Sequence, residues 1–331
     1  MTRPFAPGRL ALGVVAAGSL ACSRADLFPI TGQPPALAGG VGGAAVAGAA
    51  GGRDGSGGAG DSAGEDGSCP PNIIPQGDTT RMLNVDGTAR SYVLHVPPAY
   101  AGVSAVPLVV DFHGIGQSGA KERASSPYPA ALDALGAIMA FPDGLKGPAG
   151  TAWNVGPCCV ANVDDVAFAR ALVDDVRGVA CIDSTRVYAV GILTGGGMAH
   201  YLACHAADVF AAVAPAAFDL LAENVDDCVP SRPISVISFR GTADARVPYD
   251  GGPSSLVPGM PLTFLGAENT FETWAALDHC TGAASTPDAN GCSTFSGCDD
   301  GVEVTLCTKQ GGGEDPGDPS VAWPVLSAHP L

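Results

Sequence analysis

A glycine-framed segment near the middle of the chain, Gly191-Ile-Leu-Thr-Gly195, has the spacing of a turn that presents a nucleophile. In the Gly-x-Ser-x-Gly form of this turn, the serine stands on a sharp bend between a strand and a helix, where the glycines give the backbone room. Leu193 occupies the position of that serine here. Because a leucine side chain carries no heteroatom, no acyl-enzyme intermediate can form on it.

Three polar residues share the setting of Leu193. His113, Asp244 and Glu314 each lie at or just after the end of a predicted strand, as Leu193 does. In sheets of parallel strands, sites form outside the carboxyl ends of the strands. We therefore expect these four residues at one edge of a single sheet. His113 has the simpler alternative role of capping a strand end, and Asp244 that of capping a loop.

The elements that would position these residues are short apolar runs alternating with amphipathic segments, a pattern that predicts strands alternating with helices. Such an order folds as a mostly parallel sheet with helices on both faces, which is the α/β class. The expected strands are residues 90–96 (an antiparallel edge strand), 108–112, 137–141, 187–190, 210–214, 234–239 and 302–308; the expected helices are residues 164–176, capped by Asn162 or Asp164, 195–204 and 269–277.

Residues 1–21 have the layout of a signal peptide. Arg3 and Arg9 precede an apolar run, Leu10–Ala21, that is too short to span a bilayer. The run ends in Gly-Ser-Leu-Ala-Cys22, which resembles the lipobox of bacterial lipoproteins. We expect an exported protein tethered by lipid on Cys22, at the cell surface or outer membrane, with ordinary cleavage and an extracellular product as the alternative. No other membrane contact is expected.

Residues 22–68 are expected to be a linker, because the stretch 38–68 consists almost wholly of Gly, Ala, Ser and Asp. Such a composition has too few large apolar groups to offset the entropy of ordering. A flexible tether of this length has a mean reach of roughly 30 Å. Residues 69–331 then form one domain at the upper end of single-core size.

The cysteines favour disulfides. The chain has eleven, and setting aside Cys22 leaves an even number in an exported chain, while no CxxC pair suggests a metal site. The sequence leaves their connectivity open, and no metal or cofactor is expected. The candidates are Cys69, Cys158, Cys159, Cys181, Cys204, Cys228, Cys280, Cys292, Cys298 and Cys307.

The formal net charge of −17 excludes partners that need a basic surface. Nucleic acid and anionic membrane surfaces both bind through Lys and Arg, so neither is an expected partner. The charge keeps an exported protein soluble but does not fix its oligomeric state.

An ordered set of segments resembles a known family, the secreted α/β-hydrolases that include polyhydroxybutyrate depolymerases and type 1 feruloyl or acetyl xylan esterases. The resemblance implies an α/β-hydrolase fold and carboxylic ester hydrolysis by a serine triad. It extends from about Arg90 to Gly313 and is carried by Arg90-Ser-Tyr92, Val109–Gly114, Phe141–Gly144, Trp153-Asn154 with Cys158-Cys159, Val163–Val166 and Gly241–Asp244.

The resemblance assigns roles to single positions, and two of the three triad positions are substituted. The nucleophile position is Leu193, the base position after the glycine run is Glu314, and the retained acid is Asp244. The oxyanion hole would use the backbone N–H groups of Thr194 and of Ile115 or a neighbour. Losing the serine or the histidine alone costs about 2 million-fold in turnover in a serine protease. We therefore predict an impaired or inactive esterase, a pseudoenzyme.

Three functions remain open from the sequence. The first is an esterase-like domain that has lost hydrolysis and keeps a cleft for a polyester or polysaccharide ester. The second is an active ester hydrolase that uses Thr194 with a non-standard base, such as His329 in the C-terminal tail. The third is a non-enzymatic surface lipoprotein. His200 and His205 are expected to have surface or core roles, and Pro324 is expected to disturb the closing helix.

Overall fold

The computed structural model describes residues 69–70 and 74–331. The predicted signal peptide at 1–21, the lipidation site Cys22 and the linker up to residue 68 lie outside these residues. Within the described part of the chain, no helix combines the length and apolar character needed to cross a membrane.

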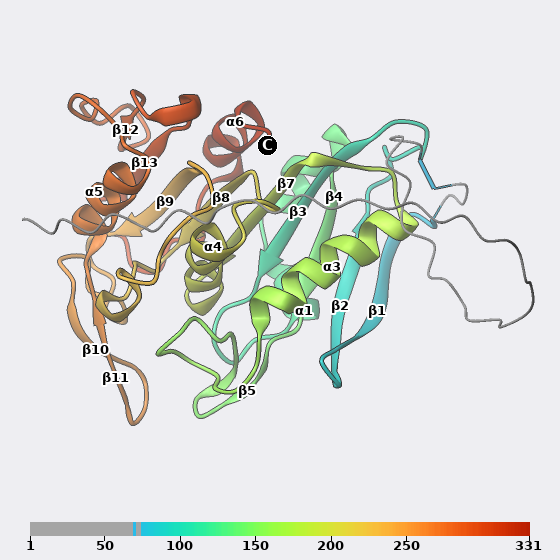
Figure 1. Cartoon of the computed structure of the whole chain (residues 1–331), viewed down its shortest axis with the longest axis horizontal. Helices are drawn as coiled ribbons and strands as arrows, with labels where there is room; N and C mark the ends of the chain where they lie inside the picture. The colour runs from blue at the N-terminus through green and yellow to red at the C-terminus, as the bar shows by residue number, and fades with distance from the viewer. Residues whose placement is uncertain (1–68, 71–73) are drawn as a thin grey trace, which may run out of the picture. The chain divides into compact units, whose positions relative to one another are not determined.

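The domain is built on one nine-stranded sheet (Figure 1). Its strands are β1 (Gly77–Val85), β2 (Thr88–Val96), β3 (Val106–Phe112), β4 (Ile138–Pro142), β7 (Ile182–Ile192), β8 (Ala212–Ala216), β9 (Ser235–Gly241), β12 (Cys292–Phe295) and β13 (Val304–Lys309). They lie in the order β1-β2-β4-β3-β7-β8-β9-β13-β12. The central run from β4 to β13 is parallel, and the outer pairings of β1 with β2, β2 with β4 and β12 with β13 are antiparallel. The predicted mostly parallel α/β sheet is confirmed. Two hairpins lie outside it, β5 (Leu145–Gly147) with β6 (Gly150–Ala152) and β10 (Gly252–Val257) with β11 (Met260–Phe264).

Helices cover both faces of the sheet. The larger core cluster joins the strands to α3 (Asp165–Val179), α4 (Thr194–His205) and α5 (Ala267–Leu277), and the smaller one joins them to α2 (Tyr128–Leu132) and α6 (Pro319–Ala328). Within β3, Leu108 and Val110 belong to the first cluster and Val109 to the second. Because alternate side chains point to opposite faces, a strand covered on both sides is mostly apolar, and in β3 the buried Asp111 is the exception. The remaining short helices are α1 (Gly119–Ser125) and three 3₁₀ turns at Asp133–Leu135, Ala222–Asn224 and Asp299–Gly301.

The expectation that Pro324 disturbs the closing helix is wrong. Helix α6 continues through Pro324 to Ala328. Asp318 caps its start by accepting the Ser320 N–H at 2.8 Å, and Pro319 occupies the first turn, where no N–H is needed. The buried side chains of Ala322 and Leu326 hold the helix on the sheet, which offsets the single hydrogen bond lost at the proline.

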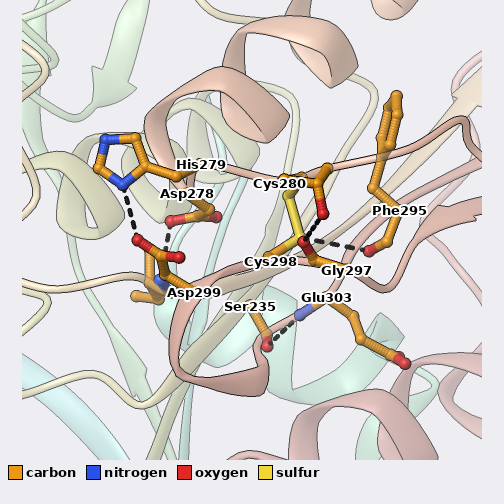
Figure 2. Close-up of a disulfide and its surroundings, with 11 residues drawn as sticks. Ser235, Asp278, His279, Cys280, Phe295, Gly297, Cys298, Asp299 and Glu303 are labelled. Carbon is orange, nitrogen blue, oxygen red and sulfur yellow. Dashed lines mark hydrogen bonds and ion pairs between the residues drawn. A yellow bond between two sulfur atoms is a disulfide. The ribbon is translucent and has the colours of Figure 1, made fainter.

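Five disulfides brace the domain, and they use all ten predicted cysteines. The pairs are Cys69–Cys181, Cys158–Cys159, Cys204–Cys228, Cys280–Cys298 and Cys292–Cys307. The last two pairs strengthen the edge of the sheet that carries β12 and β13. Figure 2 shows the Cys280–Cys298 bond, which joins the end of α5 to the loop before β13.

A buried carboxyl group, Asp278, lies beside this disulfide (Figure 2). Its Oδ1 accepts the Ile234 N–H at 3.0 Å, whereas its Oδ2 has no hydrogen-bond partner among the described residues. Burial raises the pKa of Asp278 to about 7. Burial likewise raises the pKa of Asp111 and of Asp219 to about 7.

Because burial raises the pKa values of these carboxyl groups, we predict that the free energy of unfolding falls as pH rises. The folded state keeps a proton on Asp278 up to a pKa of about 7. The unfolded chain releases it near pH 3.9, so the free energy of unfolding falls between about pH 4 and pH 7. Asp278→Asn should flatten this dependence, measured as the midpoint of thermal unfolding from pH 4 to 8. The exposed Asp226→Asn is the matched control, and an unchanged slope in D278N would contradict the assignment.

Candidate active site

The turn between β7 and α4 is a nucleophile elbow in its backbone. Leu193 has φ 52° and ψ −123°, a conformation that an L-residue adopts only when its surroundings impose it. Its N–H donates to the Ala216 carbonyl at 3.0 Å, and its own carbonyl accepts the Gly197 N–H at 2.9 Å. A Cβ at Gly195 would collide with the Phe112 carbonyl oxygen, and one at Gly196 with that of Ala216. The elbow therefore folds without its serine, because the glycines and neighbouring strand ends determine it.

The Leu193 side chain lies against the loop that follows β3. Only 7% of this residue is exposed. A Cβ built on Gly114 would lie 3.4 Å from Leu193 Cδ1, which is ordinary van der Waals contact. The end of the Leu193 side chain therefore lies close to the loop expected to supply an oxyanion donor.

That loop is fixed by His113, which is fully buried. Its Nε2 accepts the Gly144 N–H at 2.9 Å, so Nδ1 carries the proton and donates to the Gly114 carbonyl at 2.7 Å. Burial lowers the pKa of His113, which keeps the ring neutral. Trp153 Nε1–H donates to the His113 carbonyl at 2.9 Å. His113 is therefore a structural support of the loop.

The two predicted oxyanion donors follow neighbouring strands. Ile115 lies in the turn after β3, which the Gln117 N–H closes by donating to the Gly114 carbonyl at 3.2 Å. Thr194 is the first residue of α4, where a backbone N–H has no acceptor within its own helix. Since β3 pairs with β7, the strand ends bring both residues to the same edge of the sheet.

The alternative nucleophile, Thr194, lacks a base. It is fully buried, and its Oγ1 has no hydrogen-bond partner among the residues that the structure describes. His200 is buried on α4 and accepts the Trp274 Nε1–H on Nδ1 at 3.0 Å, and burial lowers the pKa of its ring to about 3. His329 Nε2 lies 3.9 Å from a Glu303 carboxylate oxygen. Each of these histidines has another partner.

Asp244 follows β9, and only one of its two carboxylate oxygens accepts hydrogen bonds from the described residues. Oδ1 accepts the N–H groups of Arg246 and Val247 at 2.8 and 3.0 Å, which closes the loop. Oδ2 is buried and has no partner in the described part of the chain. In a working triad the histidine donates to this kind of oxygen. Asp244 therefore serves as a loop cap and also keeps an acceptor to which a histidine could donate.

Behind Asp244 lies a buried ion pair that sequence reasoning missed. Arg240 Nη2 is 3.2 Å from Asp219 Oδ2, and both side chains are buried. Burial is the main cause that raises the pKa of Asp219 to about 7, and the nearby charge of Asp244 adds to it. An arginine at the end of the otherwise apolar run 234–239 was the available signal.

Glu314, at the base position, forms an ion pair of its own. Its Oε1 lies 2.7 Å from Arg246 Nε, and both side chains are partly exposed. The glycine run before it docks on the Asp244 loop, because the Ala243 N–H donates to the Gly312 carbonyl at 2.7 Å. The structure thus brings the loops of Asp244 and Glu314 together but pairs Glu314 with Arg246. The described residues include no cluster of three or more metal-ligating side chains.

Comparisons with known proteins point to one family. The family profile described as "Esterase PHB depolymerase" matches residues 90–229. Feruloyl esterase B of Piromyces equi is 44% identical over 247 residues, which are 73% of this chain and 46% of that protein, so this chain spans less than half of its length. The protein NocK of Nocardia uniformis subsp. tsuyamanensis, which carries an esterase name, is 34% identical over 258 residues, or 71% of this chain and 73% of NocK.

Among solved structures, an acetyl xylan esterase from Aspergillus awamori superposes with a TM-score of 0.54 at 16% identity. The match covers 75% of this chain and 99% of that one. At this identity the likeness concerns the fold alone.

The elbow's dependence on glycine gives a testable prediction. Gly195→Ala places a Cβ onto the Phe112 carbonyl and should destabilise the domain by about 1–3 kcal/mol or more, the usual cost of overpacking. Gly178→Ala is the matched control, because nothing lies within 4 Å of its added Cβ. Gly178 lies in the last turn of α3, so that change should leave the free energy of unfolding unchanged or raise it slightly. Urea unfolding measures both, and equal stabilities would contradict the backbone crowding inferred here.

Proposed function

Because the chain belongs to the esterase family of the PHB depolymerases, we propose that it is a member that no longer hydrolyses esters and instead binds an ester-bearing polyester or plant polysaccharide. The observation that carries this proposal is Leu193 at the tip of an otherwise complete elbow. Without a hydroxyl at this position, the acyl group of an ester has no acceptor on the protein.

The loss extends to the proton-transfer step. A serine is activated by a histidine that takes its proton, and here the base position carries Glu314 in an ion pair with Arg246. An oxyanion hole and substrate binding alone leave about 10³–10⁴-fold catalysis over water in serine proteases without their triad. The Leu193 side chain stands beside the loop that carries the predicted hole, so we expect even this remaining activity to be reduced.

Two observations support an ester-bearing ligand. The first is the name of one relative, feruloyl esterase B, which indicates feruloyl esters as the class. The second is the apolar Leu193 side chain at the nucleophile position. We propose that the acyl group of the ligand packs over the part of it that is exposed, 7% of the residue.

The proposed location is the cell surface. Five disulfides are typical of proteins that mature in an oxidising, exported compartment. A lipid on Cys22 would hold the domain there, and mass spectrometry of the mature N-terminus tests that part. An unmodified, earlier or later N-terminus would contradict it.

Hydrolysis of p-nitrophenyl acetate and butyrate tests the proposal. The unchanged chain should match a heat-inactivated control. Leu193→Ser with Glu314→His should raise turnover at least tenfold above either single variant, because the serine and the free Asp244 Oδ2 then flank an introduced base.

Clear turnover by the unchanged chain would overturn the proposal. In that case Thr194→Ala separates the remaining explanations, since loss of activity would identify Thr194 as the nucleophile.

The proposed ligand binding has its own test. Retention of the protein on a polyester film or on feruloylated xylan would support it. If neither the polyester film nor feruloylated xylan retains the folded protein, the proposed ligand binding is contradicted.

A further inference from the structure

Two buried carboxyl groups, those of Asp111 and Glu122, lie on the face of the sheet that α2 and α6 cover. Asp111 is 2% exposed and Glu122 is 8% exposed. Asp111 follows Val109 by two positions in β3, and Val109 belongs to the core cluster of that face, so the two side chains point the same way. Asp111 and Glu122 line one cavity of about 10 Å³, together with Ser126 and Tyr128. A space of this size holds about one water molecule, so the two carboxyl groups share a nearly dry environment.

The pair joins the two ends of the loop that follows β3. Asp111 is the last but one residue of β3, and Glu122 lies in α1, which begins directly after the loop. Helix α1 packs on β2, β3 and β4. The cavity is also lined by Gly191 and Ile192, the last two residues before Leu193. A change in the contact between α1 and β3 therefore reaches the strand that leads into the elbow.

Only one of the two carboxyl groups has a hydrogen bond that favours its charged form. Ser126, which follows α1, donates its Oγ–H to Asp111 Oδ2 at 2.6 Å. Glu122, one turn earlier, has no side-chain hydrogen bond or ion pair in the described part of the chain. The first negative charge in the cavity is therefore stabilised on Asp111, and a second charge on Glu122 is not.

The surroundings supply no counter-ion for a second charge. The basic residues of α1 do not line the cavity: Lys121 is exposed, and Arg123 Nε donates to Asp78 Oδ1 at 2.9 Å. Tyr128 lines the cavity from α2, and burial raises its pKa, so its hydroxyl keeps its proton. Asp318, at the start of α6, adds negative charge near Tyr128. Among the described residues, the groups around the pair are thus neutral or acidic.

Ionisation of the pair weakens the contact of α1 with the sheet. Burial raises the pKa of both groups, and the charge of Asp111 raises that of Glu122 further, to about 8. When α1 is detached, both carboxyl groups meet water and ionise near pH 4. The attached state therefore binds more protons than the detached state, and its stability falls from about pH 4 to about pH 8.

From this arrangement we propose that Asp111 and Glu122 form a proton-operated switch, which holds α1 on the sheet and releases it when both carboxyl groups ionise. The first residue of α1 stays in place, because the Gly119 N–H donates to Asp143 Oδ1 at 2.8 Å. The part that moves is the remainder of α1 up to Ser126, and its release uncovers the strand before the elbow. The switch goes beyond the proposed function, because it needs no ligand.

Amide hydrogen exchange of the full chain tests the proposal, read as protection factors that are corrected for the intrinsic effect of pH on exchange. Between pH 6 and pH 9, the protection of residues 122–126 should fall at least tenfold, the change that one pKa unit represents, and more than that of α4. Glu122→Gln keeps the size of the side chain and cannot ionise, so it should remove most of this fall. Glu272→Gln, on an exposed position of α5, is the matched control and should behave like the unchanged chain.

Equal protection of residues 122–126 at both pH values in the unchanged chain would overturn the proposal, whether or not the variants fold. A fall that persists in full in both Glu122→Gln and Asp111→Asn would also overturn it. A fall of the same size in α4 would indicate unfolding of the whole domain and would contradict a switch at α1. No ester or polymer enters this experiment, so hydrolysis of p-nitrophenyl acetate by the unchanged chain would defeat the proposed function and leave this test intact.

Discussion

The close approach of three backbone segments is the constraint on which the site depends. The elbow backbone passes so near the ends of β3 and β8 that no side chain fits at Gly191, Gly195 or Gly196. This crowding holds Leu193 in a conformation it would not choose alone. The geometry of the elbow is therefore a property of the glycines and strands, and it forms with a leucine at its tip.

The buried ion pair of Arg240 and Asp219, like the glycines of the elbow, supports the structure of the site. Arg240 and Asp219 lie beside Asp244, and removing one member would leave an uncompensated charge in a dry environment. Such a group resists substitution whether or not it takes part in a reaction. The partly exposed pair of Glu314 and Arg246 carries no such cost.

The sequence predicted the sheet and the elbow because both follow from local patterns: apolar runs on buried strands, and glycines where the backbone is crowded. The same reasoning offered Asn162 or Asp164 as the cap of α3, and the structure has Asp164 there. Sequence could not place the Arg240–Asp219 pair or the partner of Glu314, because these contacts join residues from different loops. It also misjudged Pro324, since the packing of α6 on the sheet is a tertiary effect that no local rule contains.

The Cys69–Cys181 disulfide determines where a force applied to the N-terminal side of the domain would enter the sheet. It bridges 112 positions in sequence and joins the first described residue to the one before β7. Tension applied ahead of Cys69 can pass through this covalent link into a central strand of the sheet. The β1–β2 hairpin, which would otherwise be peeled away strand by strand, lies outside that load path.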